Sequence, residues 1–141
     1  MKFRLLDIKL KKAFYALNEE VIAGADEEKV FEIKKDLGIS IARDNEDKNL
    51  IKVELRIKND DINSPFNFDL VYEGYFKFEL PKEISDEEIE KIGLINCAAI
   101  IFPYLREHLA DLIRRSGLPP YHLPPINFVR LYKERYKSCG G

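Results

Sequence analysis

Apolar and charged residues alternate with a period of two through one stretch of this chain, and no other feature restricts its fold more. The apolar set is Ile51, Val53, Leu55 and Ile57, and the charged set is Lys52, Glu54, Arg56 and Lys58. Successive side chains of a strand point to opposite faces of the sheet. The stretch therefore predicts a half-buried strand with one face on a core and the other in water.

Three further segments extend this sheet. Residues 66–80 keep apolar side chains at the same parity, with Gly74 in phase, where we expect a bulge or bend. A shorter alternation covers 37–41, and residues 3–17 alternate less regularly, with a phase slip at 5–8. Polar turn residues at 44–49 and 59–65 separate the segments 37–41, 51–58 and 66–80. Short turns of this kind favour antiparallel neighbours. The sequence thus predicts a four-stranded antiparallel sheet over about 3–80.

The second half of the chain is predicted to be helical, over about 86–137. Ser85 followed by Glu88 forms a capping box, and Ile84 with Ile89 can form the hydrophobic staple around it. The first helix should end before Gly117, and Pro103 inside it should produce a kink. A short last helix is expected at about 127–137. Strands first and helices after them indicate a single α+β domain over 1–141.

The long helix carries more apolar surface than one sheet can cover. Between residues 94 and 102 it has almost no polar side, so it must be covered on more than one side. One interpretation is a core helix covered by loops, and the other is a helix that packs against its copy in a symmetric oligomer. The predicted interface residues are Ile95, Ala98, Ala99, Ile101 and Phe102.

Composition excludes several classes of function. The chain has 23 basic and 25 acidic residues and a formal net charge of −2, which argues against a nucleic-acid partner. Its two cysteines make no disulfide framework. The longest apolar run is far shorter than the roughly 20 residues that span a bilayer, so we expect no membrane insertion. These features predict a soluble, cytoplasmic protein.

No group of residues resembles an active site. Cys97 lies in an apolar stretch, where a thiol is normally inert packing. His108 has Glu107 and Asp111 near it on the helix, but these are typical surface charges. His122 has no evident partner. We therefore expect no enzymatic activity, no metal site and no cofactor.

One set of motifs is similar to a known family. Residues 101–104 (Ile-Phe-Pro-Tyr) and 123–128 (Leu-Pro-Pro-Ile-Asn-Phe), with the spacing between them, resemble the signature of the SecB export chaperones. The similarity is strong over 96–131 and looser over the strands. It implies a four-stranded antiparallel sheet with a long kinked helix and a short C-terminal helix packed on one face. It also implies a homotetramer, a dimer of dimers, that binds unfolded polypeptides without ATP.

The resemblance also implies where unfolded clients bind. Members of this family hold non-native chains in long hydrophobic grooves lined by the second strand, the crossover before the long helix, and both helices. The corresponding residues here are Leu37, Ile39, Ile41, Phe76, Phe78, Leu80, Ile84, Tyr121 and Leu131.

The chain departs from export-type members in its charges. Those members dock the translocase motor ATPase through acidic residues on the sheet, and only Asp69 matches such a position; Lys12 and Ala16 stand at two others. Its tail is basic. A dedicated chaperone of an antitoxin, in a toxin–antitoxin system, is therefore an alternative. From another class, a carrier of a small apolar ligand could use the same groove.

Overall fold

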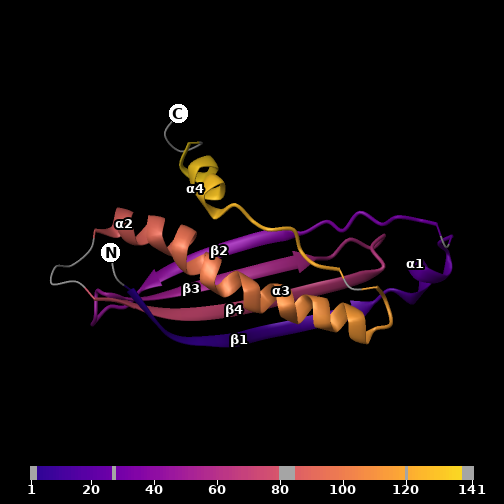
Figure 1. The fold of residues 1–141 in the computed structure, drawn as a ribbon, viewed down its shortest axis with the longest axis horizontal. Coiled ribbons are helices and arrows are strands. Elements are labelled where there is room, and N and C mark those ends of the chain that lie inside the picture. Colours follow the sequence, from indigo (N-terminus) through magenta and orange to yellow (C-terminus); the bar gives the residue numbers. More distant parts are fainter. Residues whose placement is uncertain (1–2, 27, 80–84, 120, 138–141) are drawn as a thin grey trace.

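The computed structural model describes residues 3–26, 28–79, 85–119 and 121–137. A single antiparallel sheet contains four strands in the order β1-β4-β3-β2, so β1 and β2 form its edges. The elements follow the chain as β1 Phe3–Leu17, α1 Glu19–Ala23, β2 Asp36–Arg43, β3 Leu50–Asn59, β4 Phe66–Phe78, α2 Asp86–Ile92, η1 Gly93–Cys97, α3 Ala98–Arg115 and α4 Phe128–Lys137. The long helix crosses one face of the sheet, and α4 stands at the side of β2 (Figure 1). The predicted α+β fold is confirmed.

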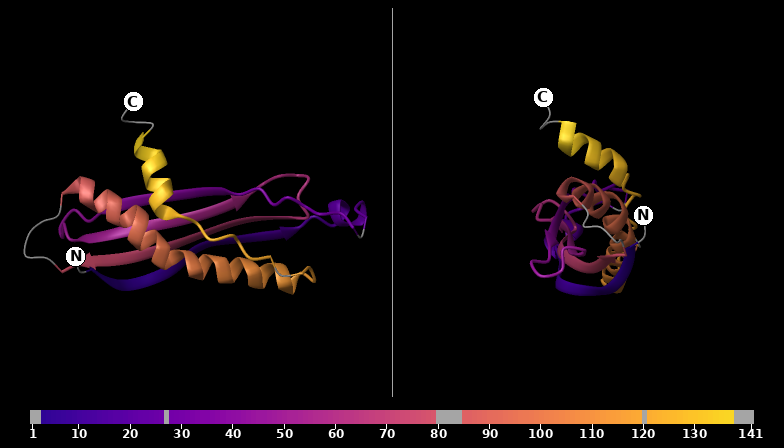
Figure 2. Two further views of the ribbon diagram at one scale, coloured as in Figure 1. Left: turned by 45° about the horizontal axis from the view of Figure 1, so that its top comes forward. Right: turned by 90° about the vertical axis from the view of Figure 1, so that its left-hand side faces the viewer.

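The alternation predicted the buried face of the sheet. Ile51, Val53, Leu55 and Ile57 of β3 are all 1% exposed or less, and they pack against buried residues of α3 such as Leu105 and Leu109. The intervening charged residues of β3 lie on the opposite face, which no helix covers. Figure 2 shows this arrangement of one helical layer on one sheet.

The irregularities of the sheet lie in β1. The pairing of β1 with β4 shifts register between Leu5 and Asp7, where the sequence predicted a phase slip, and again between Leu10 and Lys12. The bulge expected as one alternative at Gly74 is wrong, because that residue is paired in register with Ile8 and with Val53. A glycine is needed there for another reason: a Cβ atom would lie 2.8 Å from the Cδ1 atom of Ile101.

The long helix begins and ends where its capping residues predict. The Ser85 hydroxyl accepts a hydrogen bond from the Glu88 amide at 3.2 Å, and Gly117 has a φ of 86° after the last turn. Ile84, the other half of the expected staple, lies outside the described residues. The helix changes direction along its course (Figure 1), and it contains a π-helical turn, η1, ahead of Pro103. Neither this turn nor α1 was predicted from the sequence.

Substituting Gly74 by alanine should destabilise the fold, because the added Cβ atom would lie 2.8 Å from side-chain atoms of Ile101 and Phe76, which are both fully buried. Overpacking of this kind costs about 1–3 kcal/mol of unfolding free energy. The control is Gly38→Ala in β2, where the nearest atom to an added Cβ is 3.9 Å away. Thermal denaturation of both variants should show a lowered midpoint for Gly74→Ala alone; equal midpoints would contradict this packing.

Candidate functional site

An apolar groove of about 440 Å³ lies between β2 and α4. Leu37, Ile39, Leu94 and Leu131 form its apolar lining, whereas Glu134 and Arg135 are the charged residues at it. We call it the β2 groove. It offers the arrangement that ligand sites commonly have, with apolar walls and a few polar groups that orient what binds.

The alternation in β2 supplies one wall of this groove. Leu37, Ile39 and Ile41 share one face of the strand and are each half-buried. At Ile41 the helix comes close: a Cβ atom on Gly93 would lie 2.7 Å from the Ile41 Cδ1 atom, so only glycine allows this approach. Ile41 is therefore packed beneath η1, whereas Leu37 and Ile39 open into the groove.

The start of α4 fixes the opposite wall. The Asn127 side-chain oxygen accepts a hydrogen bond from the Arg130 amide at 3.0 Å, which caps the helix. Phe128 is buried, and its ring meets that of Phe102 edge-on at 5.8 Å. These contacts hold the first turn of α4 and place Leu131 in the β2 groove.

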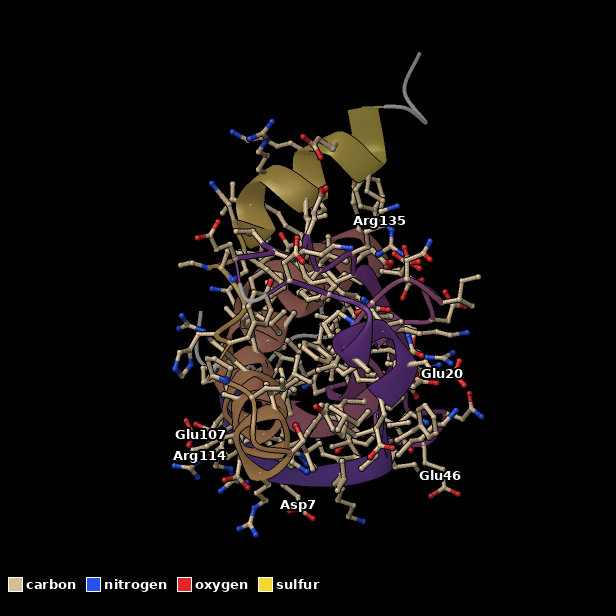
Figure 3. The ribbon with its side chains drawn as sticks, turned by 90° about the vertical axis from the view of Figure 1, so that its right-hand side faces the viewer. Asp7, Glu20, Glu46, Glu107, Arg114 and Arg135 are labelled. Atoms are coloured by element: carbon tan, nitrogen blue, oxygen red, sulfur yellow. The ribbon has the colours of Figure 1, made fainter. Side chains whose placement is uncertain are left out.

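The side chain of Arg135 connects α4 to the backbone of β2. Its guanidinium donates a hydrogen bond from Nη2 to the main-chain oxygen of Ile39 at 3.2 Å. Figure 3 shows Arg135 on the side of α4 that faces the body of the molecule. The charged end of this side chain thus lies at the edge of β2, where the groove meets the open side of the sheet.

A second groove of about 530 Å³ is lined in part by the segment that precedes β2. Its lining includes Phe31 and Ile33 from the segment before β2, Phe66 from β4, and Leu118 and Tyr121 from the connector after α3. Phe31 and Ile33 keep the parity of Leu37 and Ile39, so apolar side chains recur at nearly every second position over 31–39. The two grooves therefore follow one extended stretch of chain.

The structure separates the nine predicted client-binding residues into groups. It brings Leu37, Ile39 and Leu131 together in the β2 groove and places Tyr121 in the second groove. Phe76 and Phe78, at 0% and 1% exposure, lie in the core of the subunit. The remaining members are Ile41, which packs under η1, and Leu80 and Ile84, which lie outside the described residues.

Sequence reasoning missed three lining residues, of which two carry a signal in the sequence. Phe31 and Ile33 continue the alternation of β2 upstream, although the sequence between them and β1 contains no regular pattern. Leu94 belongs to the apolar stretch of the helix, and its position in the groove follows only from the close approach of η1 to β2.

The five predicted interface residues also differ in exposure. Ala98 and Ile101 are fully covered within the subunit, and Phe102 is 6% exposed, because these side chains pack on the sheet or on Phe128. Ala99 is exposed and Ile95 is half-buried. The helix exposes further apolar surface beside them, at Pro103 and Tyr104.

Asp69 lies on the outer face of the sheet but is only 5% exposed. Arg56 donates to both of its carboxylate oxygens, at 2.8 and 2.6 Å, and Lys12 donates to one of them at 2.8 Å. The hydrogen bonds from Arg56 and Lys12 lower the pKa of Asp69 to about 2, against the effect of burial. The exposed carboxylate that the family resemblance implies is therefore enclosed by two cations, one of them Lys12.

Glu73 repeats this arrangement four residues further along β4. It is 2% exposed and contacts Lys11 and Lys52 at 3.4 and 3.2 Å, and the Tyr75 hydroxyl donates to it at 3.0 Å. Burial raises the pKa of Glu73, but the hydrogen bonds outweigh it and the pKa falls below its ordinary value. Asp69 and Glu73, the two carboxylates of β4 on the outer face, thus lie beneath half-exposed cations.

Cys97 and His108 both make contacts within the subunit. Cys97 is fully buried, and burial raises the pKa of its thiol to about 12. The His108 ring shares a hydrogen bond of 2.8 Å with the Tyr72 hydroxyl. Among the residues that the structure describes, no cluster of His, Cys, Asp or Glu could hold a metal ion, and no helix has the length and apolar character to cross a bilayer.

The antiparallel sheet, the one long helix that covers it and the apolar groove along an edge strand place the chain among α+β proteins with a single sheet and one helical layer. The sequence profile of one family, described as "Preprotein translocase subunit SecB", matches residues 16–138. The chain belongs to the SecB family.

Known proteins support this assignment. The protein-export protein SecB of Xanthobacter autotrophicus is 33% identical over 78 residues, which are 55% of this chain and 48% of that protein. The SecB of Paraburkholderia xenovorans is 47% identical over 60 residues, covering 43% and 38% of the two chains. The matches thus span about half, or less, of these curated relatives.

A solved structure has the same fold. It is a SecB-like chaperone of Mycobacterium tuberculosis, in complex with a peptide from the HigA1 antitoxin. The TM-score is 0.73 at 17% sequence identity, and the match covers 88% of this chain and 90% of that one.

The enclosed carboxylate of Asp69 should make stability depend on acid pH. Its pKa is lower in the folded state, so it stabilises the fold above pH 4, and this contribution is lost as the pH falls from about 4 to 2. Asp69→Asn should lower the unfolding free energy by about 1–2 kcal/mol at neutral pH, since both partners are half-exposed and screened.

Urea titrations at several pH values would measure this difference. The gap between wild type and Asp69→Asn should narrow toward pH 2. Asp60→Asn is the matched control, because the Asp60 side chain is 75% exposed. A gap that stays constant from pH 6 to pH 2 would show that the ion pairs of Asp69 do not stabilise the fold.

Proposed function

We propose that this chain is an ATP-independent holdase that binds non-native polypeptides in the β2 groove and prevents their aggregation. The observation that carries the proposal is an apolar groove in a folded subunit, where Leu37, Ile39 and Leu131 stay partly exposed and the buried Leu94 forms the floor. Unfolded chains expose apolar segments that otherwise associate with one another. A groove that binds those segments removes them from aggregation by mass action.

The second groove extends the surface available to one client. Its lining residues Ile33 and Tyr121 pack against the same core that supports the β2 groove. Two weak contacts along a single flexible chain add through effective concentration, so moderate affinity at each groove is sufficient. Such binding needs no nucleotide, because release follows from the weakness of each contact.

We further propose that the chain forms a homo-oligomer, with a tetramer built as a dimer of dimers. Support comes from apolar surface that the subunit leaves uncovered. Edge strand β1 exposes Leu6, Leu10 and Phe14 by 46%, 48% and 49%, and an unpaired edge with apolar side chains readily associates. The helix exposes Ala99 and Tyr104 on its outer side.

A dedicated role in protecting an antitoxin is the second candidate. The observation that favours it is the outer face of the sheet, where Asp69 and Glu73 are enclosed by cations and offer no acidic docking surface. The neighbour from Mycobacterium tuberculosis was solved with an antitoxin peptide. Neighbouring genes for a toxin and an antitoxin would support this candidate, and binding of the purified chain to a translocase motor ATPase would favour export.

The holdase proposal predicts protection of an unfolded client in proportion to the amount of chaperone. Light scattering of a chemically denatured client, diluted with and without the chain and without nucleotide, measures this. Leu131→Asp places a charge in the groove and removes apolar carbons that a client would cover. Each buried methylene group contributes roughly 0.8 kcal/mol, so the loss should weaken protection about tenfold. Val129→Asp, at a 45% exposed position of the same helix, should protect like wild type. No protection by the wild type at molar excess would contradict the proposal.

The oligomer proposal predicts a change in subunit number. Leu10→Glu adds a charge to the apolar edge of β1 and should reduce the molar mass measured by multi-angle light scattering. Val30→Glu carries the same charge at a position 91% exposed and should leave the mass unchanged. A wild-type mass of one subunit, or an equal mass for both variants, would argue against assembly through β1.

A further inference from the structure

The outer face of the sheet, opposite the helical layer, carries its charges at two levels. Asp69 and Glu73 of the central strand β4 form the lower level, at 5% and 2% exposure. Above each carboxylate lie two half-exposed cations, which are Lys12 and Arg56 over Asp69 and Lys11 and Lys52 over Glu73. We call these four residues the cation layer. A molecule that approaches this face meets the cation layer before it reaches either carboxylate.

The buried carboxylates use only part of the hydrogen-bonding capacity of the cation layer. A lysine ammonium group has three N–H donors, and Lys12 gives one of them to Asp69 at 2.8 Å. Arg56 donates to Asp69 through Nε and Nη2, and its Nη1 forms no hydrogen bond with any residue that the structure describes. Donors that face solvent therefore remain available to an acceptor from outside the subunit.

Neighbouring charges leave the face with a positive excess. Glu54, half-buried on β3, offsets one of the four cations, and Lys9 and Asp7 of β1 cancel each other. Lys9 lies over the Tyr75 ring, 5.2 Å from its centroid, and forms no ion pair with a described residue. Because two acids of this face are buried beneath cations, the groups that an approaching partner can contact are mainly basic.

Ion pairs close both ends of this basic area. At one end Lys77 donates to Asp47 at 2.7 Å, and at the other Lys58 lies 3.6 Å from Asp60. The side chains of these two acids are 39% and 75% exposed, so a long polyanion would meet negative charge as soon as it left the cation layer. The whole chain also carries a net charge of −2, which disfavours an extended nucleic acid. The arrangement fits a short acidic segment better.

The spacing of the two buried carboxylates sets the length of that segment. Asp69 and Glu73 are four residues apart on one face of β4, which corresponds to about 13 Å at roughly 3.3 Å per residue. In an extended chain, acidic side chains at every second position lie about 7 Å apart on one side. A stretch of about five residues therefore reaches the cations above both carboxylates.

We propose that the outer face binds an acidic segment of a partner polypeptide, with the carboxylates of that segment on the cation layer. Asp69 and Glu73 hold the cations in place in the empty protein, so less side-chain freedom is lost on binding. Unlike the holdase function, this binding uses the face of the sheet opposite the β2 groove. A partner and an unfolded client can thus occupy one subunit together.

Fluorescence anisotropy with the full chain tests the proposal. The probe is a rhodamine-labelled dodecapeptide of alternating glutamate and serine, and the reference probe has glutamine in place of each glutamate. The wild type should bind the glutamate peptide more tightly than the glutamine peptide. Its affinity should fall as the salt concentration rises from about 0.05 to about 0.3 M, because exposed charges are screened.

The double substitution Lys11→Gln with Lys12→Gln removes half of the cation layer and leaves one cation on each buried carboxylate. It should weaken binding of the glutamate peptide by about threefold to tenfold, since each exposed ion contact contributes modestly. The matched control is Lys91→Gln with Lys133→Gln, which makes the same change in net charge at exposed positions of α2 and α4. Its affinity should stay within about twofold of the wild type.

Aggregation assays on the same variants separate this proposal from the holdase function. The double variant should still protect an unfolded client, because the β2 groove is intact. If it loses protection as well, its fold is damaged, and Lys9→Gln alone decides: this variant touches no buried carboxylate and should still weaken binding of the glutamate peptide. An unchanged affinity for Lys9→Gln in that case would overturn the proposal.

Three other results would overturn the proposal while the holdase function stands. One is equal affinity for the glutamate and glutamine peptides. Another is an equal loss of affinity in the double variant and its control. The third is tighter binding of a twelve-nucleotide oligothymidylate, or of phosphatidylglycerol vesicles, than of the glutamate peptide, because either result would assign the cation layer to a different partner.

Discussion

The coverage of a four-stranded sheet by a single helix is the constraint on which the rest of this structure depends. Strands lie about 4.8 Å apart, so four of them span roughly 15–19 Å, whereas a helix with its side chains is about 10–12 Å wide. The helix seals the central strands β3 and β4, which is why Phe76 and Phe78 are buried. Apolar side chains of the two edge strands are left over, at Leu37 and Ile39 of β2 and at Leu10 of β1.

The close approach of this helix to the sheet determines the shape of the apolar surface left at β2. Gly93 lets η1 sit directly on Ile41, and Gly74 lets α3 sit on β4 through Ile101. Larger residues at either glycine would lift the helix and open the core. Because the helix is held low over the sheet, Leu94 reaches the side of β2 and completes the groove with Leu131. The packing of the core and the shape of the β2 groove therefore arise from the same contacts.

Period-two and capping patterns predicted much of this fold, because they report on local geometry. Such patterns specified β3, β4 and both ends of the long helix, and the phase slip in β1. They could not separate Phe76 from Ile39, since parity gives the face of a sheet but not which strand the helix covers. Asp69 was predicted as an exposed carboxylate, and only pairing across β1, β4 and β3 brings Lys12 and Arg56 to it. The π-turn and α1 have no distinct pattern in the sequence.

An open strand edge beside an apolar groove is hazardous for any protein, because two copies can pair along it and aggregate. The two edges here are treated differently. On β1, lysines such as Lys9, Lys11 and Lys12 are interleaved with the exposed apolar residues. They restrict pairing to a partner that carries acidic side chains. On β2, the Arg135 guanidinium donates a hydrogen bond to the backbone oxygen of Ile39. Charged side chains therefore guard both edges, and no other strand of the described residues covers either one.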